Sequence, residues 1–198
     1  MTATPLTERQ EDALREFANM GSAKAASMLA RLVGDVGVLV DVPVVLAANR
    51  YQLGWLLGGR DVKVHASLFG IEGELRGSLW WVLRDADAQR LGQRLLARPG
   101  VSGPLSSSSS AALAEAANIV ASACLSAMGT LVHANLLPTT PEVRETTVKA
   151  LVGDGERDDV QTVLAAGFTS TNAPGFAGLL VVMLDGDTTA AALERLGV

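Results

Sequence analysis

The sequence predicts a mixed α/β protein in which two long helices pack on a β-sheet core and two halves are related by a pseudo-twofold axis. Three observations lead to this prediction. The pair Glu16 and Asn19 recurs as Glu115 and Asn118, 99 positions later in a chain of 198 residues. Helical and strand-like segments follow one another in the same order in both halves. Hydrophobic residues make up 48% of the chain but aromatic residues only 4%, so the core must be built mainly from Ala, Leu and Val.

The first half begins with a long helix, predicted over residues 6–34. Thr7 is a suitable N-cap, acidic residues follow it where the helix dipole is positive, and Gly34 marks the end. A shorter helix closes this half at residues 88–97, with Asp85 or Asp87 as its cap.

Three segments between these helices are expected to be strands. Residues 36–47 are rich in Val, and Pro43 within them indicates an edge strand or a break. Residues 62–70 and 73–84 have β-branched and aromatic residues and are expected to be joined by a turn at Gly70–Gly73.

The clearest boundary is residues 98–110, which contain Pro, Gly and a run of serines and read as a linker followed by a helix N-cap. A second long helix is predicted over residues 110–134. Strands are then expected at 145–153, 160–170 and 175–185, with an acidic turn after the first of them and a final helix from about Thr188. We therefore expect one domain made of two repeats, about 1–100 and 101–198.

The composition excludes several classes of function. The net charge is −5 and no cluster of Lys and Arg is present, so the chain has no nucleic-acid footprint. No uninterrupted apolar run reaches the ~18 residues that cross a bilayer, and the N-terminus does not resemble an export signal. The single Cys124 fits a reducing compartment and is expected to be a buried structural thiol. These features predict a cytoplasmic protein without membrane insertion.

The repeated acid and amide suggest a shared chemistry. Residues three apart on a helix lie about 60° apart around its axis, so Glu16 and Asn19 share one face, as do Glu115 and Asn118. Asn is a mediocre residue for the middle of a helix, so its repetition there favours a functional reading over a solvated surface. An amide donates and accepts hydrogen bonds and can orient one water toward an activated electrophile such as a phosphoryl group. The carboxylate would need a cation beside it, which a lysine of a partner protein could supply.

Other catalytic chemistries find no support in the sequence. No Ser/His/Asp or Cys/His arrangement accompanies the pairs. His65 and His133 lie in different segments and are expected to be a strand residue and a helix-end residue, not metal ligands. No metal-ligand spacing or glycine-rich phosphate loop is present, and residues 56–61 and 153–159 read as turns. The pairs therefore read as half of an active site whose other half belongs to another protein.

With these residues in view, the sequence resembles the CheC-type phosphatases of bacterial and archaeal chemotaxis, relatives of CheX and of the flagellar switch protein FliY. The family motif is an Asp or Ser, then Glu four residues later and Asn three after that, on a long helix. The first repeat matches this motif with Asp12, Glu16 and Asn19, and the second with Glu115 and Asn118. The likeness covers essentially the whole chain.

The resemblance implies hydrolysis of the aspartyl phosphate on a CheY-like receiver domain. Each Asn would align the attacking water, each Glu would pair with the active-site lysine of the receiver, and Asp12 would contribute to partner binding. The Mg²⁺ would belong to the phosphorylated receiver, so the resemblance implies no metal or cofactor of the chain's own. Ala111 replaces the leading polar residue of the second motif, which removes a hydrogen bond worth ~1 kcal/mol. Both sites are expected to be competent, but not necessarily equal.

Two other readings remain open. The same helix faces would serve a docking or switch-type adaptor that binds the phosphorylated receiver without hydrolysing it. The strand surfaces could instead regulate another enzyme, such as a CheD-like deamidase, since CheC itself forms a complex with CheD.

Overall fold

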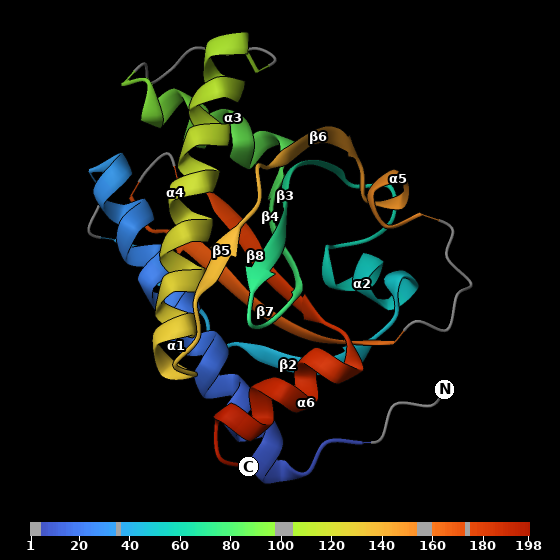
Figure 1. Ribbon diagram of the computed structural model, residues 1–198. Helices are drawn as coiled ribbons and strands as arrows, with labels where there is room; N and C mark the ends of the chain where they lie inside the picture. The colour runs from blue at the N-terminus through green and yellow to red at the C-terminus, as the bar shows by residue number, and fades with distance from the viewer. Residues whose placement is uncertain (1–4, 35–36, 98–104, 154–159, 173–174) are drawn as a thin grey trace.

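The computed structural model describes residues 5–34, 37–97, 105–153, 160–172 and 175–198. One order of elements, helix–strand–strand–helix–strand–strand–helix, occurs twice along the chain (Figure 1). The first half contains α1 (Glu8–Val33), β1 (Val38–Val40), β2 (Val44–Ala48), α2 (Arg50–Leu56), β3 (Lys63–Gly73), β4 (Gly77–Arg84) and α3 (Asp85–Leu95). The second half contains α4 (Ser107–Leu131), β5 (Leu136–Pro138), β6 (Glu142–Thr147), α5 (Val148–Val152), β7 (Gln161–Ser170), β8 (Ala177–Leu184) and α6 (Gly186–Arg195).

All eight strands form one antiparallel sheet. Its order is β1–β7–β8–β4–β3–β5, with β2 also paired to β7 and β6 also paired to β3. At the centre, β4 pairs with β8, and Trp80 lies opposite Val181 while Trp81 lies opposite Leu180. Exchanging the two halves reproduces this pairing, so a pseudo-twofold axis passes between β4 and β8. The predicted mixed α/β fold with a pseudo-twofold axis is confirmed.

The halves are interlocked through their first two strands. β1 and β2 pair with β7 of the second half, and β5 and β6 pair with β3 of the first half. Neither half therefore completes its part of the sheet alone. One domain made of two repeats, about 1–100 and 101–198, stays a prediction. Of the boundary predicted at residues 98–110, residues 98–104 lie outside the described residues, and α4 begins at Ser107 within the remainder.

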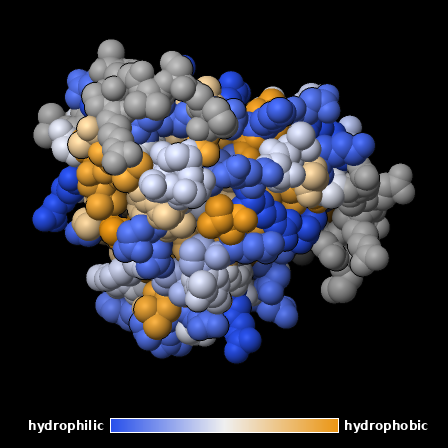
Figure 2. Space-filling view, turned by 90° about the horizontal axis from the view of Figure 1, so that it is seen from above, coloured by the Kyte–Doolittle hydropathy of each residue, from blue (hydrophilic) through white to orange (hydrophobic). Residues whose placement is uncertain are grey.

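Two hydrophobic clusters cover the two faces of the sheet. The larger one joins α1, α3, α4 and α6 to side chains such as Phe69, Trp81 and Phe168. The smaller one joins α2 and α5 to alternate residues of the same strands, including Val64, Ala66 and Val82. The long helices therefore lie on one face of the sheet and the short helices on the other (Figure 1). Seen from above in Figure 2, hydrophobic residues on the surface form separate patches among polar ones.

α1 begins and ends where the sequence predicts, whereas α4 begins and ends three residues before the predicted range of 110–134. The Thr7 hydroxyl accepts a hydrogen bond from the backbone N–H of Gln10, and the Gln10 side chain accepts one from the N–H of Thr7, which completes a capping box. Gly34 ends α1 in the left-handed conformation, with φ of 62°. Ser106 caps α4 by accepting from the N–H of Ser109, so the serine run is the start of this helix.

Three sequence predictions about the first half need correction. Residues 50–56 form a helix, α2, that was not predicted. The turn expected at Gly70–Gly73 lies at residues 74–76, because β3 continues through Gly70 to Gly73. The N–H of Gly70 donates to Thr139 Oγ1 at 2.9 Å, and the absence of a side chain on Gly70 leaves room for this threonine. Neither Asp85 nor Asp87 caps α3: the helix starts at Asp85, and its N-cap Arg84 makes no side-chain capping bond.

The second half departs from prediction at two short elements. Residues 136–138 form β5, which was not predicted. The strand expected at 145–153 ends at Thr147, whose hydroxyl accepts from the N–H of Ala150 and starts α5.

Two other predictions are confirmed. Pro43 separates β1 from β2, and the final helix starts at Gly186, close to the expected Thr188.

By length and composition α4 also passes as a membrane span. One such helix is weak support for a span, because core helices of soluble proteins pass the same test. Here its buried face, which includes Leu113, Val120 and Leu125, packs in the larger core.

Candidate functional site

The first predicted pair lies on the exposed side of α1. Glu16 and Asn19 are both exposed, as is Asp12 one turn earlier. The intervening Phe17 is 1% exposed and Leu14 is fully buried in the main core. Because these apolar side chains fix the rotation of the helix, the acid and the amide are directed away from the sheet.

The second pair lies on α4 in the same manner. Glu115 and Asn118 are exposed, whereas Leu113, Ala116 and Ala117 next to them are buried. The structure thus places all four predicted side chains on the surface, in two separate but equivalent helix positions.

The equivalence extends along the full exposed face of both helices. Six positions of α1 and the six positions 99 residues later in α4 are all exposed. These pairs are Asp12 with Ala111, Glu16 with Glu115, Asn19 with Asn118, Ala23 with Ser122, Ser27 with Ser126, and Arg31 with Thr130. The two motifs therefore occupy the same register relative to the core.

The four predicted side chains are available to a partner. Within the described part of the chain, the carboxylates of Glu16 and Glu115 and the amides of Asn19 and Asn118 make no hydrogen bond or ion pair. Asn19 accepts one hydrogen bond through its backbone oxygen, from the Ser22 hydroxyl at 3.3 Å. An exposed amide with free donors and acceptor can hold a water, and a free carboxylate can receive a cation from another protein.

The two helices pack closely side by side, and Gly21 lies at the contact. A Cβ placed on Gly21 would lie 2.6 Å from Met128 Cγ and 2.8 Å from Cys124 Sγ. The helices run in opposite directions, since α6 contacts both the start of α1 and the end of α4 (Figure 1). Asn19 precedes the contact on α1 and Asn118 precedes it on α4, so the amides lie on opposite sides of it, separated along the helices by roughly 12–18 Å. The two predicted pairs therefore occupy separate places on the surface.

Arg15 is a charged neighbour of the first site that the sequence prediction did not include. Its Nη1 donates to Asp12 Oδ1 in an ion pair within one turn of α1. Opposite charges three residues apart are the sequence signal that predicts such a contact. Ala114 occupies the equivalent position of α4.

The remaining candidate groups fit structural roles. Cys124 is buried, and desolvation raises the pKa of its thiol to about 12, so it is an unreactive core residue as predicted. His65 is a buried residue of β3 and His133 follows the end of α4, also as predicted. Among the described residues no three His, Cys, Asp or Glu side chains gather in a way that could hold a metal ion. Gly58 and Gly59 adopt positive φ in the turn predicted at 56–61, and most of the turn predicted at 153–159 lies outside the described residues.

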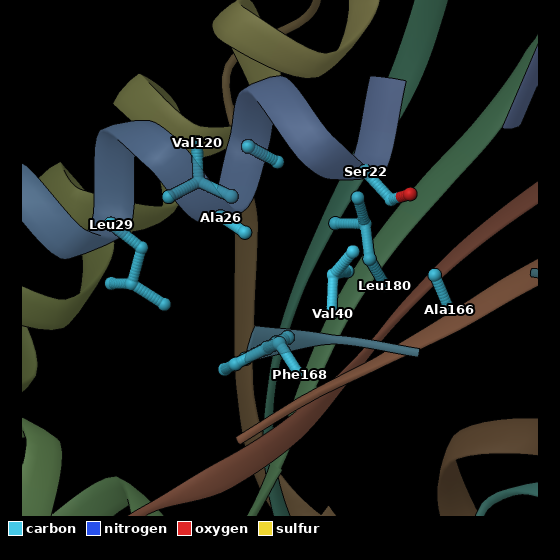
Figure 3. Close-up of a pocket in the computed structure, with 9 residues that line it drawn as sticks. Ser22, Ala26, Leu29, Val40, Val120, Ala166, Phe168 and Leu180 are labelled. Carbon is cyan, nitrogen blue, oxygen red and sulfur yellow. The ribbon is translucent and has the colours of Figure 1, made fainter. Parts of the chain in front are cut away.

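The pocket between α1 and the sheet does not offer an alternative active site. Figure 3 shows side chains from α1, α4 and the strands converging on it, with the Ser22 hydroxyl as the one labelled polar group. Its volume is about 10 Å³, enough for a single water at most.

A larger groove lies beside α4. It has a volume of about 570 Å³ and runs between the second half of this helix and β5. Ser122, Ser126 and Thr130 line it, and they continue the exposed face that carries Asn118.

Comparison with known proteins gives consistent results. Residues 10–46 match the model of the CheC-like family, and this segment contains the first motif. The chain is 31% identical over 154 residues to the CheY-P phosphatase CheC of Bacillus subtilis (strain 168), covering 76% of this chain and 73% of that protein.

Solved structures share the fold at lower identity. FliY of Thermotoga maritima matches with a TM-score of 0.77 and 16% identity over 98% of both chains. FliM in a FliM–SpeE complex from H. pylori matches with a TM-score of 0.70 and 11% identity, over 98% of this chain and 97% of that one. CheX of Desulfovibrio desulfuricans matches with a TM-score of 0.59 and 16% identity, over 85% of this chain and 99% of that one.

Proposed function

The chain belongs to the CheC-like family, and from this premise we propose that it is a phosphatase that hydrolyses the aspartyl phosphate of a CheY-like response regulator. The proposal rests on one observation above all: Asn19 and Asn118 are exposed in equivalent positions of two helices, beside Glu16 and Glu115. A relative at 31% identity is named a CheY-P phosphatase, which supports this class of substrate.

In this proposal each amide enters the receiver's site and positions a water. The aspartyl phosphate is already an activated electrophile, so alignment of the water can supply much of the rate acceleration. The amide carbonyl oxygen accepts a hydrogen bond from the water, and a lone pair of the water oxygen is then directed at phosphorus. The proposal assigns the attack to a water, because the Glu and Asn side chains of the described motifs act here by positioning and not as nucleophiles.

The two carboxylates serve docking and alignment. Glu16 and Glu115 each offer a free carboxylate about one turn before the amide, so a lysine of the receiver could pair with either one. Such an ion pair would fix the rotation of the receiver against the helix. A Mg²⁺ ion, if required, would be held by the receiver.

The test is the decay of phosphate on a purified receiver. We expect Asn19→Ala and Asn118→Ala each to lose one site and to retain activity through the other. The double variant should return decay to the spontaneous rate, a loss on the order of 100-fold at saturating phosphatase, because misplacing the reacting water by about 1 Å already costs this much.

Asn135→Ala provides the matched control. It removes an exposed asparagine side chain that lies outside both helix faces, so decay should equal that with wild type. Wild-type decay in the Asn19→Ala/Asn118→Ala variant would show that these amides are not the catalytic groups.

A non-catalytic adaptor is the second candidate. The fold is also that of FliM, which the solved structures show in complexes with other proteins, SpeE among them. Charge reversal by Glu16→Lys and Glu115→Lys would abolish receiver binding under either reading. The adaptor reading requires in addition that wild type leaves the lifetime of the receiver's phosphate unchanged.

Binding of a CheD-like deamidase is a further candidate and involves a different surface. Leu39, Val42 and Val44 are exposed around the β1–β2 edge of the sheet, and Val42 is 77% exposed. An exposed apolar edge of this kind suits a protein partner. Recovery of a deamidase, and no receiver, in a pulldown from the source cell would favour this reading over the phosphatase.

A further inference from the structure

The two motif helices differ by one ion pair, which is present in α1 and absent from α4. Asp12 and Arg15 form it, and the equivalent positions of α4 hold Ala111 and Ala114, so both partners are replaced together. We infer that Arg15 is a docking residue of the α1 site, held in place by Asp12, and that it gives this site a higher affinity for the phosphorylated partner than the α4 site. This inference rests on the proposed function.

The geometry places Arg15 next to the catalytic amide. At about 100° per residue, Arg15, Asn19, Asp12 and Glu16 lie in this order within an arc of roughly 100° on the helix. Arg15 and Asn19 are four residues apart and hence adjacent on the surface. A partner group that meets the Asn19 amide therefore also lies within reach of the guanidinium.

The ion pair with Asp12 orients Arg15 and leaves part of its guanidinium available to a partner. Asp12 accepts from Nη1, and in the described part of the chain Nε and Nη2 of Arg15 make no hydrogen bond. Its side chain is 38% exposed and that of Asp12 66%, so both are open to a partner. Because a long side chain loses rotamer freedom on binding, a carboxylate that already restrains it lowers this entropic cost. Asp12 thus acts as a positioning residue through Arg15.

The chemistry of the proposed partner matches a guanidinium. A phosphoryl group is anionic, and Mg²⁺ at such a site is held by carboxylates, so the rim of the receiver's site is acidic. The planar fork of Arg suits phosphate and carboxylate oxygens. The α4 site has no counterpart: Glu115 is the only charged residue between Ser107 and Leu131.

The experiment isolates each site before changing it. Asn118→Ala leaves the α1 site, and Arg15→Ala or Arg15→Lys is then added. Asn19→Ala leaves the α4 site, and Ala111→Asp with Ala114→Arg transfers the pair to it. Turnover of a phosphorylated receiver gives KM and kcat, and binding of the receiver loaded with beryllofluoride gives Kd without any turnover.

In the α1-only protein we expect Arg15→Ala to raise KM and Kd about three- to fivefold at low salt, the range of an exposed charge pair, with kcat unchanged. Arg15→Lys should recover part of this loss. The transferred pair should lower KM and Kd of the α4-only protein by a similar factor. Arg31→Ala, which removes an arginine from the same exposed face three turns beyond Asn19, is the control and should change neither constant.

The outcomes separate this inference from the proposed function. Unchanged KM and Kd in Arg15→Ala, with normal turnover, would overturn the inference and leave the phosphatase intact. A fall in kcat at constant KM would also overturn it, since Arg15 would then act in the chemical step. A weakened Kd in a protein without turnover would support Arg15 as a docking residue and refute the phosphatase.

Discussion

Asn19 and Asn118 owe their exposure to the apolar residues beside them. Phe17 and Leu113 are buried, and their burial leaves the amide on the opposite side of each helix. Both spacings are visible in the sequence, so the exposed position of the amides could be predicted from local periodicity alone. Whether the amides act as proposed depends on the receiver assay.

His65 is a buried ionisable group whose protonation should affect stability in mild acid. It is 2% exposed, and burial lowers the pKa of its imidazole, while Glu145 and Asp85 oppose this shift. The Glu145 carboxylate lies 3.5 Å from Nδ1, beyond the distance of a good hydrogen bond, and among the described residues neither ring nitrogen has a hydrogen-bond partner. Leu164 in β7 holds the corresponding position of the second half, where Phe168 corresponds to Phe69.

These facts predict a loss of stability in mild acid. Above the unfolded pKa of about 6.5 the imidazole is neutral in both states and contributes no pH dependence. As the pH falls below that value, the unfolded chain takes up a proton that the folded protein still excludes, so the free energy of unfolding decreases until the folded pKa is reached. Denaturant titrations of wild type and His65→Leu between pH 7.5 and pH 5 measure this, and the variant should show the smaller decrease. Equal slopes for the two proteins would contradict the assignment to His65.

At the scale of the elements, the contact between α1 and α4 sets how the two sites are placed. The helices approach closely at Gly21, where a Cβ would lie 2.6 Å from Met128 Cγ and 2.8 Å from Cys124 Sγ, so these side chains would have to move to make room for it. A glycine inside a helix lowers its intrinsic stability, and the sequence alone presents Gly21 as a weak point of the helix. The structure shows that it is a packing requirement.

Gly21→Ala should therefore destabilise the protein despite alanine's better helix propensity. The new methyl group would have to displace Met128 or separate the helices, an overpacking cost of about 1–3 kcal/mol. Thermal or chemical unfolding measures the effect. Gly186→Ala is the matched control, since a Cβ there meets nothing within 4 Å, and its stability should equal or slightly exceed that of wild type. A Gly21→Ala protein as stable as this control would show that the helices can adjust.

The short elements show where local sequence signals fail. α2 and α5 contain seven and five residues, too few for a helical hydrophobic pattern to stand out. Thr146 and Thr147 are β-branched, and the apolar Val148 and Leu151 that follow them suit a strand or a helix, so the sequence pattern predicts a strand that continues past Thr147. The apolar residues of α2 and α5 are buried together against the same face of the sheet, and this burial, not local propensity, favours the helical conformation.

At the scale of the whole molecule, the two halves are interlocked through their strands. β1 and β2 hydrogen-bond to β7, and β5 and β6 to β3, so each half supplies strands to the other. β4 and β8 join the halves at the centre of the sheet. A half on its own would expose these strand edges and its share of the core.

Because the strands are interlocked, we predict that neither half of the chain folds as a monomer and that every folded species contains two halves, joined in one chain or associated. Residues 1–97 and 105–198 produced separately should not be folded monomers, because each would lack the partner strands of its sheet. Co-expressed, they should associate and unfold in one transition, and any folded form of a single half should be a dimer. Size-exclusion chromatography with circular dichroism measures this. A monomeric half with a cooperative unfolding transition would contradict the prediction.

The sequence by itself determined the two long helices, their caps at Thr7 and Gly34, the repeated acid and amide, and the helix face they share. These features depend on residues within a few positions of each other, and helix periodicity translates such spacing directly into geometry. The tertiary structure alone decided that the first two strands of each half pair with the opposite half, that the motif helices are antiparallel, and that Gly21 fits under Met128. These features depend on contacts between residues about a hundred positions apart, and sequence periodicity carries no information about which distant segments meet.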